Sequence, residues 1–269
     1  MLKADQPIGI FDSGVGGLTV AHSIKSVLPR EKIVYFGDTF HLPYGDKSED
    51  SVRYYSLRIA DFLLERDCKI ILIACNTASA SAYEEVVEHV GDRAIVMNVI
   101  DPVVNTVSGM HVSGKVGVIG TKGTINSGTY EKKIKQISPS VEVTSMATPL
   151  LVPMIEEGFI FDDISNAILK AYLSDQQLKE IQTLILGCTH YPIIKKQIEE
   201  FFEFNVEVVD SGFSVASSLK LLLEENKLIK TGTTGMHDFF VSDYTHWFEK
   251  ISKMFFGEKI QLELLNFWK

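Results

Sequence analysis

The chain has 269 residues, of which 45% are apolar and 23% are charged, and its net charge at pH 7 is −9. This composition buries enough apolar surface to offset chain entropy, which excludes a disordered protein. The acidic balance argues against nucleic-acid binding and against an anionic membrane surface. Residues 1–7 lack the apolar core of a signal peptide and no apolar run is long enough to span a bilayer, so we expect a cytoplasmic protein.

Short runs rich in β-branched residues alternate with segments of helical period, which is typical of an α/β protein with mainly parallel sheets. Asp46 with Glu49 predicts a capping box at the start of the second helix. A helix is expected over 215–223, and two edge strands are expected at 239–241 and 260–264. The other predicted strands are 8–12, 33–37, 70–74, 94–99, 116–120, 141–146, 183–187 and 206–210.

Three pairs of strand segments resemble each other at separations of about 110 residues, which suits two domains of similar fold. The pairs are 8–13 with 116–121, 71–77 with 184–190 and, more weakly, 97–101 with 206–210. Chance similarity between ordinary strands is the alternative. We predict one discontinuous domain of residues 1–99 plus 210–269 and a second domain of residues 100–209, each a mainly parallel sheet flanked by helices, with the active site between them.

Cys75 and Cys188 both stand where a predicted strand ends and a helix is about to begin. Ligands of open parallel sheets collect at this edge, and a helix N-terminus lowers the pKa of a nearby thiol. Asn76 and Thr77 are suitable N-cap residues, and Pro192 suits a first helical position. If the two halves face each other, the thiols approach one cleft from opposite sides, as proton exchange at a stereocentre requires. The alternative is a pair of inert buried cysteines.

Other interpretations of the motifs are weaker. The segment from Cys188 to His190 has too few neighbouring ligands for a zinc site, so we expect no metal, and His190 suits an acid/base or hydrogen-bonding role. The glycines of 14–17 lack the spacing of a dinucleotide fingerprint, and this loop suits a small anion instead. Asp12 is a candidate carboxylate beside Cys75 that helps to take or hold a proton. The alternative is that Asp12 only forms the turn. Cys68 has no flanking motif and is assigned a structural role.

Several motifs in one fixed order closely resemble those of the glutamate racemases, in the cofactor-independent aspartate/glutamate racemase superfamily. The resemblance spans residues 8 to about 215. One departure is Thr148-Pro149, where family members often have Cys-Pro, and it affects local packing more than chemistry. The matching segments are 11–19, 38–39 with 43–45, 74–80, 152–153 with 156–158, 186–192 and 209–212.

The resemblance implies an amino-acid racemase that interconverts L- and D-glutamate for peptidoglycan synthesis, with no cofactor. It implies that Cys188 removes the Cα proton of L-glutamate while Cys75 protonates the opposite face. Asp12 and His190 are implied as the respective partners of the thiols, with Glu156 near Cys188. The implied substrate-binding residues are Asp12, Ser13, Tyr44, Gly45, Asn76, Thr77, Thr121, Thr189 and His190.

Three alternatives stay open at this point. One is another enzyme of the superfamily, such as an aspartate racemase. The second is a non-catalytic amino-acid-binding or regulatory protein, and the third is a cysteine hydrolase, which leaves the second thiol unexplained. The expected partner is a small-molecule substrate, with neither nucleic acid nor membrane, and the sequence does not determine the oligomeric state, for which a homodimer is one alternative.

Overall fold

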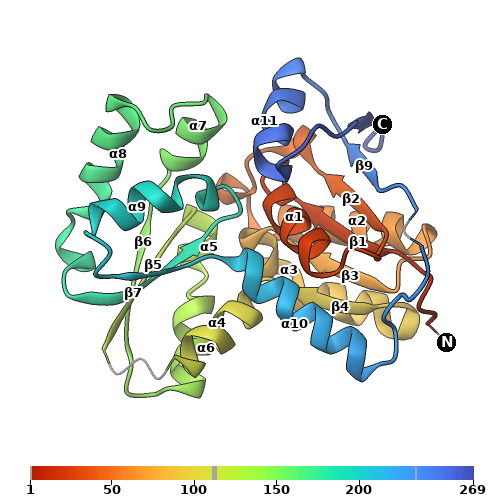
Figure 1. Ribbon diagram of the computed structural model, residues 1–269, viewed down its shortest axis with the longest axis horizontal. Helices are drawn as coiled ribbons and strands as arrows, with labels where there is room; N and C mark the ends of the chain where they lie inside the picture. Colours follow the sequence, from red (N-terminus) through yellow and green to blue (C-terminus); the bar gives the residue numbers. More distant parts are fainter. Residues whose placement is uncertain (1, 111–113, 234) are drawn as a thin grey trace.

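The computed structural model describes residues 2–110, 114–233 and 235–269, and two parallel sheets organise this part of the chain (Figure 1). The first sheet has the strand order β10-β9-β2-β1-β3-β4, and every neighbouring pair in it is parallel. Its strands are β1 (Ile8–Asp12), β2 (Ile33–Gly37), β3 (Ile70–Ile73), β4 (Ile95–Asn98), β9 (Asp238–Val241) and β10 (Glu263–Leu264).

The second sheet has the order β6-β5-β7-β8, again with parallel neighbours. Its strands are β5 (Lys115–Gly120), β6 (Glu142–Ala147), β7 (Ile181–Gly187) and β8 (Glu207–Val209). This order repeats the arrangement β2-β1-β3-β4 of the first sheet. The three pairs of similar segments occupy equivalent strands, namely β1 and β5, β3 and β7, and β4 and β8, so the predicted repeat is confirmed.

Helices cover both faces of each sheet, as parallel sheets require (Figure 1). Along β3, Ile70 and Leu72 face a core that includes residues of α1, α10 and α11, whereas Ile71 and Ile73 face residues of α2 and α3. The helices are α1 (Leu18–Val27), α2 (Glu49–Glu65), α3 (Asn76–Val90), α4 (Ile100–Gly109), α5 (Lys122–Asn126), α6 (Thr129–Ile137), α7 (Leu151–Glu156), α8 (Asp163–Leu173), α9 (Lys195–Phe201), α10 (Ser211–Glu225) and α11 (His246–Phe256).

The α/β class with two helix-flanked parallel sheets is thus as predicted. Short 3₁₀ turns complete the described elements: Thr39–His41, Tyr44–Asp46, Gly91–Arg93, Gln176–Leu178 and Tyr191–Ile194. The boundaries near residues 100 and 210 between the two proposed domains stay a prediction.

Two local predictions were wrong. Helix α2 is capped by Ser48, whose side chain accepts a hydrogen bond from the Ser51 amide, and not by Asp46. Asp46 instead ends a 3₁₀ turn and forms an ion pair with Lys122. Strand β9 is not an edge strand, because the two-residue strand β10 pairs with its outer side.

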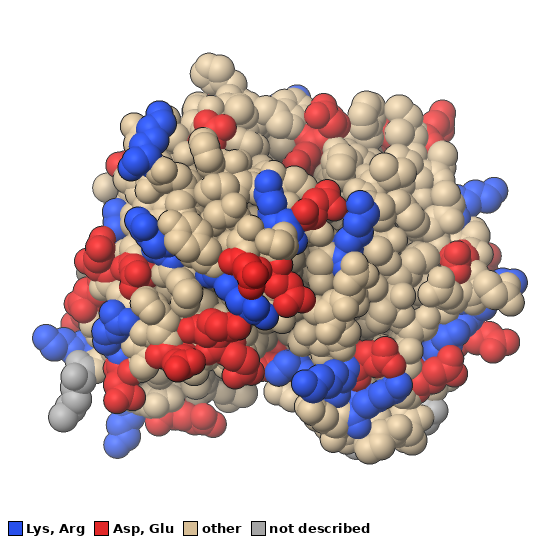
Figure 2. Space-filling model, turned by 180° about the vertical axis from the view of Figure 1, so that it is seen from behind, with Lys and Arg blue, Asp and Glu red and all other residues tan. Residues whose placement is uncertain are grey.

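In the described residues no helix is long and apolar enough to cross a membrane. Figure 2 shows acidic and basic side chains interspersed over the face seen from behind.

Candidate active site

The residues that follow four parallel strands line one cavity between the two sheets. Ser13 follows β1 and Cys75 follows soon after β3, while Thr121 follows β5 and Cys188 follows β7. The carboxyl ends of parallel strands share one edge of a sheet, so the facing edges of the two sheets supply opposite walls. The two thiols therefore meet at the same cavity.

Most of the expected site residues line this cavity, but Asp12 and Glu156 stand behind its walls. Its volume is about 30 Å³, room for little more than one water molecule. A neighbouring cavity of about 200 Å³ shares part of the wall and includes Glu156. The cavity is lined by Ser13, Leu42, Pro43, Tyr44, Gly45, Cys75, Asn76, Thr77, Thr121, Thr124, Val152, Gly187, Cys188, Thr189 and His190.

Cys75 is itself the N-cap of α3, in place of the predicted Asn76 or Thr77. Its sulfur accepts a hydrogen bond from the amide of Ala78 at 3.5 Å. Burial and the charge of Asp12 nevertheless raise the pKa of the Cys75 thiol to about 12, although the Ala78 amide and the Ser13 hydroxyl act in the opposite direction. The expectation of a lowered pKa was wrong here, because desolvation outweighs the helix terminus. Cys75 holds its proton in this closed cavity.

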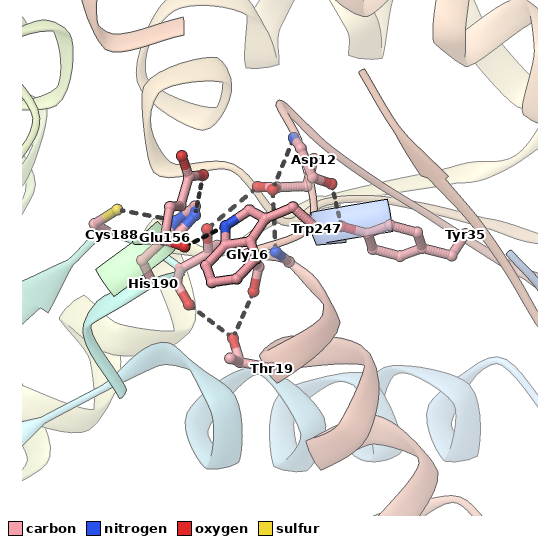
Figure 3. A network of polar contacts seen from close by, with 11 residues as sticks. Asp12, Gly16, Thr19, Tyr35, Glu156, Cys188, His190 and Trp247 are labelled. Atoms are coloured by element: carbon pink, nitrogen blue, oxygen red, sulfur yellow. Dashed lines mark hydrogen bonds and ion pairs between the residues drawn. The ribbon is translucent and has the colours of Figure 1, made fainter. Parts of the chain in front are cut away.

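Asp12 is fully buried at the end of β1 and anchors the loop that follows it (Figure 3). Its Oδ2 accepts hydrogen bonds from the amides of Gly14 and Gly17, and its Oδ1 accepts one from the hydroxyl of Thr189 at 3.4 Å. Burial raises the pKa of Asp12, while the positive charge of His190 and these hydrogen bonds oppose the rise. Thr189 thereby links the end of β7 to the end of β1.

His190 lies between Cys188 and Glu156 (Figure 3). Its Nδ1 is 3.8 Å from the Cys188 sulfur, and its Nε2 is 2.9 Å from Glu156 Oε1. Burial alone would lower the pKa of His190, but the hydrogen bonds and negative charges of Cys188 and Glu156 raise it to about 10. An imidazolium is therefore the stable form of His190 at neutral pH, and it places a positive charge beside the Cys188 sulfur. The indole of Trp247 in α11 donates to the carbonyl oxygen of Glu156.

The loop after β1 approaches the histidine so closely that only glycine fits. A Cβ added to Gly16 would lie 2.4 Å from Nδ1 of His190 and 2.6 Å from Oγ1 of Thr189. The Thr19 hydroxyl bridges the same gap, since it donates to the carbonyl oxygens of Gly16 and Thr189. These contacts seat the end of β7 against the start of α1.

The remaining cavity wall offers neutral polar groups, with no lysine or arginine among the lining residues. The hydroxyls of Thr77, Thr121 and Thr124 lie within 2.9–3.2 Å of one another. Asn76 accepts a hydrogen bond from Tyr130 through Oδ1, whereas its buried Nδ2 has no partner among the described residues. An unpaired buried amide is costly, so this N–H₂ group is poised to donate to an acceptor in the cavity.

Sequence reasoning missed Thr124, which lines the cavity, and Tyr130, which donates a hydrogen bond to the lining residue Asn76. Thr124 is placed by a local signal, because its amide donates to Thr121, the N-cap of α5, three residues earlier. Tyr130 carries no such signal, since an aromatic residue in a helix is typical of a core position. Its role is visible only once α6 packs beside the start of α3.

Thr148, the one departure from the expected motifs, packs against Tyr191 and the end of β5. Thr148 is fully buried, and its hydroxyl lies 2.7 Å from the Tyr191 hydroxyl and 3.3 Å from the Gly120 carbonyl oxygen. The polar side chain is satisfied there without entering the cavity between the thiols.

Comparisons with known proteins agree with this architecture. The family model of Asp/Glu/Hydantoin racemase matches residues 18–218. A glutamate racemase of Geobacter metallireducens is 44% identical over 254 residues, which are 94% of this chain and 93% of that protein. The crystal structure of glutamate racemase from Francisella tularensis in complex with D-glutamate has a TM-score of 0.92 and 41% identity, covering 98% of this chain and 99% of that one.

A further solved structure is that of a glutamate racemase from Thermus thermophilus in complex with beta-chloro-D-alanine. It has a TM-score of 0.88 and 35% identity, and it covers 98% of both chains. The family match extends over most of the chain, and the relatives align over nearly their whole length. The chain therefore belongs to the Asp/Glu/Hydantoin racemase family, as an amino-acid racemase of its glutamate racemase group.

Proposed function

We propose that this protein interconverts L- and D-glutamate by a two-base mechanism in which Cys75 and Cys188 act on opposite faces of one Cα. The observation that carries the proposal is that both sulfurs line one cavity from the carboxyl ends of equivalent strands, β3 and β7. The complex of the Francisella tularensis relative with D-glutamate supports this substrate.

The surroundings of the two thiols differ, and this difference supports different roles for them. The imidazole of His190, whose pKa is raised to about 10, lies 3.8 Å from the Cys188 sulfur, whereas burial and the charge of Asp12 raise the pKa of Cys75 to about 12. We propose that Cys188 acts as the base, beside the His190 cation, and that Cys75 acts as the acid. Cys188 would take the Cα proton, and Cys75 would release its own proton to the other face of the carbanion, which leaves a Cys188 thiol and a Cys75 thiolate. The resemblance to glutamate racemases makes this the L-to-D direction.

The substrate carboxylates need hydrogen-bond donors, because no lysine or arginine is among the residues that line the described cavity and the His190 imidazolium is paired with Glu156. The unpaired Nδ2 of Asn76 and the hydroxyls of Ser13, Thr77, Thr121 and Thr189 are the proposed donors, with Tyr44 and Gly45 in the wall. Donors to the α-carboxylate stabilise the charge that develops when the Cα proton leaves. We infer that the walls separate to admit glutamate, since the closed cavity of about 30 Å³ is too small for it.

The proposed role in the cell is to supply D-glutamate for peptidoglycan synthesis in the cytoplasm. Neither a metal nor an organic cofactor enters the proposed mechanism, because two thiols on opposite faces of Cα account for both proton transfers.

The test is racemisation of L-glutamate in deuterium oxide without added cofactor. D-glutamate that carries deuterium at Cα is expected, and racemisation without Cα deuterium contradicts the proposal. Cys75→Ser and Cys188→Ser should each lower the rate by about 10²–10⁴-fold, the usual contribution of an acid or base. Cys68→Ser is the matched control, because this buried cysteine lies outside the cavity. Faster turnover of aspartate than of glutamate would assign the substrate differently.

A further inference from the structure

Asp38 is a fully buried carboxylate behind the cavity wall, and four side chains donate hydrogen bonds to it. Its Oδ2 accepts from Nδ1 of His41 at 2.8 Å and from the hydroxyl of Tyr44 at 2.7 Å. Its Oδ1 accepts from the hydroxyl of Ser242 and from the indole N–H of Trp268, both at 2.7 Å. A buried carboxylate needs such donors, because its desolvation is otherwise uncompensated.

Two of these donors belong to the segment that forms part of the cavity wall. Tyr44 is buried and lines the cavity, and His41 comes three residues before it. Burial and the charge of Asp38 raise the pKa of Tyr44 well above its ordinary value, so its phenol stays neutral and remains a donor. The next residue, Gly45, packs so closely on Thr121 that an added Cβ would lie 2.6 Å from the threonine Cβ. The position of the cavity wall at Tyr44 and Gly45 therefore depends on the position of Asp38.

The other two donors come from the far end of the chain. Ser242 directly follows β9, and Trp268 is the second-last residue, beyond β10. The Trp268 ring packs edge-on against His41 and Tyr55, with centroid separations of 4.6 and 5.4 Å. The preceding Phe267 packs on Phe36 of β2 at 4.9 Å. The C-terminal residues therefore lie against the same side of the first sheet as α2.

We propose that Trp268 is a positioning residue of the active site. Its indole N–H holds Asp38 in the orientation that accepts the hydrogen bond from Tyr44. Through this contact the segment 265–268, which we call the strap, keeps the cavity wall at Tyr44 in position. This inference rests on the proposed function only where its test measures the kinetics of glutamate racemisation. Trp268 does not line the cavity, so it acts through Asp38 and is not a catalytic residue.

The decisive variant is Trp268→Phe, which keeps an aromatic ring for packing but removes the donor. We expect the KM for glutamate to rise about tenfold, the loss expected for one hydrogen bond to a charged group, with a smaller change in kcat. Hydrogen exchange of the backbone amides of residues 39–47, followed by mass spectrometry without substrate, should become faster. Ser242→Ala removes the other donor to the same oxygen and should change both readouts in the same sense.

The matched control is Asn266→Ala, an exposed position in the same tail, which should leave KM and exchange unchanged. An unchanged KM in Trp268→Phe overturns the proposal, even if the variant unfolds at lower temperature, because the ring would then serve packing alone. Unchanged exchange in residues 39–47 overturns it as well. The exchange comparison needs no substrate, so it decides whether the strap holds the wall even if the wild-type protein fails to racemise glutamate.

Discussion

Nε2 of His190 lies 2.9 Å from Oε1 of Glu156, and the histidine side chain is only 4% exposed. The pair places a negative charge on the side of the imidazole that faces away from Cys188. A negative charge at this distance raises the pKa of His190. The positive charge beside the Cys188 sulfur therefore depends on a carboxylate at the opposite nitrogen of the imidazole.

Glu156→Gln should shift the alkaline limb of the pH profile of kcat/KM towards neutral pH. The variant removes a charge that raises the pKa of His190, so the imidazolium should lose its proton about 1–3 pH units lower. Glu157→Gln is the control, since the neighbouring side chain is exposed. The profile is measured from initial rates between pH 6 and pH 10. Coincident profiles of Glu156→Gln and wild type would refute the claim that Glu156 controls the charge of His190.

The stability of the protein should fall as the pH rises above neutrality. The pKa of His190 is raised from 6.5 to about 10, so its stabilising contribution is complete below pH 6.5 and is lost as the pH approaches 10. Cys75 acts in the same direction at higher pH, because its pKa is raised from 9.0 to about 12 and only the unfolded state ionises in between. Urea unfolding should show a loss on the order of a few kcal/mol between pH 7 and pH 10. In His190→Asn the slope should be shallower, and equal slopes would count against the assignment.

Gly45→Ala should impair the reaction without unfolding the protein. The added methyl group would lie 2.6 Å from Cβ of Thr121, so the two walls of the cavity would be pushed apart. Overpacking of this kind costs about 1–3 kcal/mol, and we expect kcat/KM to fall about tenfold or more. Gly109→Ala is the control, because a Cβ there meets no atom of the described residues within 4 Å. Wild-type kinetics in Gly45→Ala would show that the walls are not in contact during turnover.

Lys69→Met should strongly destabilise the protein. The Lys69 ammonium is 2.7 Å from Glu31 Oε2, both side chains are almost fully buried, and it also donates to the carbonyl oxygens of Ala4 and Leu228. Removing the lysine leaves Glu31 as an uncompensated buried charge, at a cost of about 3–5 kcal/mol in the free energy of unfolding. The unfolding midpoint in urea measures the effect.

The control for Lys69 is Lys196→Met. Lys196 forms an exposed pair with Glu200 at 3.8 Å, and such pairs contribute about 1 kcal/mol or less. Equal losses of stability in the two lysine variants would contradict the distinction between buried and exposed pairs.

Local sequence patterns predicted where the strands lie, but they did not predict the cap of α2 or the place of β9 in the sheet. The runs at 8–12 and 33–37 match β1 and β2 to the residue, because a strand buried on both faces has a nearly continuous apolar sequence. The capping residue of α2 was misassigned to Asp46, since Ser48 two residues later has the same capping chemistry. The edge position expected for β9 was wrong because strand pairing depends on the whole sheet.

In the candidate site, too, residues with a local sequence signal were predicted and contacts between distant residues were not. Cys75 and Cys188 are recognisable because they stand at the ends of apolar runs in similar segments, which is a property of neighbouring residues. The link from Trp268 to Asp38 joins residues 230 positions apart and has no local signal.

What the sequence by itself determined is the order of strands and helices, the repeat of about 110 residues and the pair of thiols at equivalent strand ends, because periodicity and motif spacing are local. Only the tertiary structure decided that burial raises the pKa of Cys75, that Glu156 sustains the charge of His190, and that the chain end supports the cavity wall. Each of these depends on desolvation and on contacts between distant segments, which arise when the chain is folded.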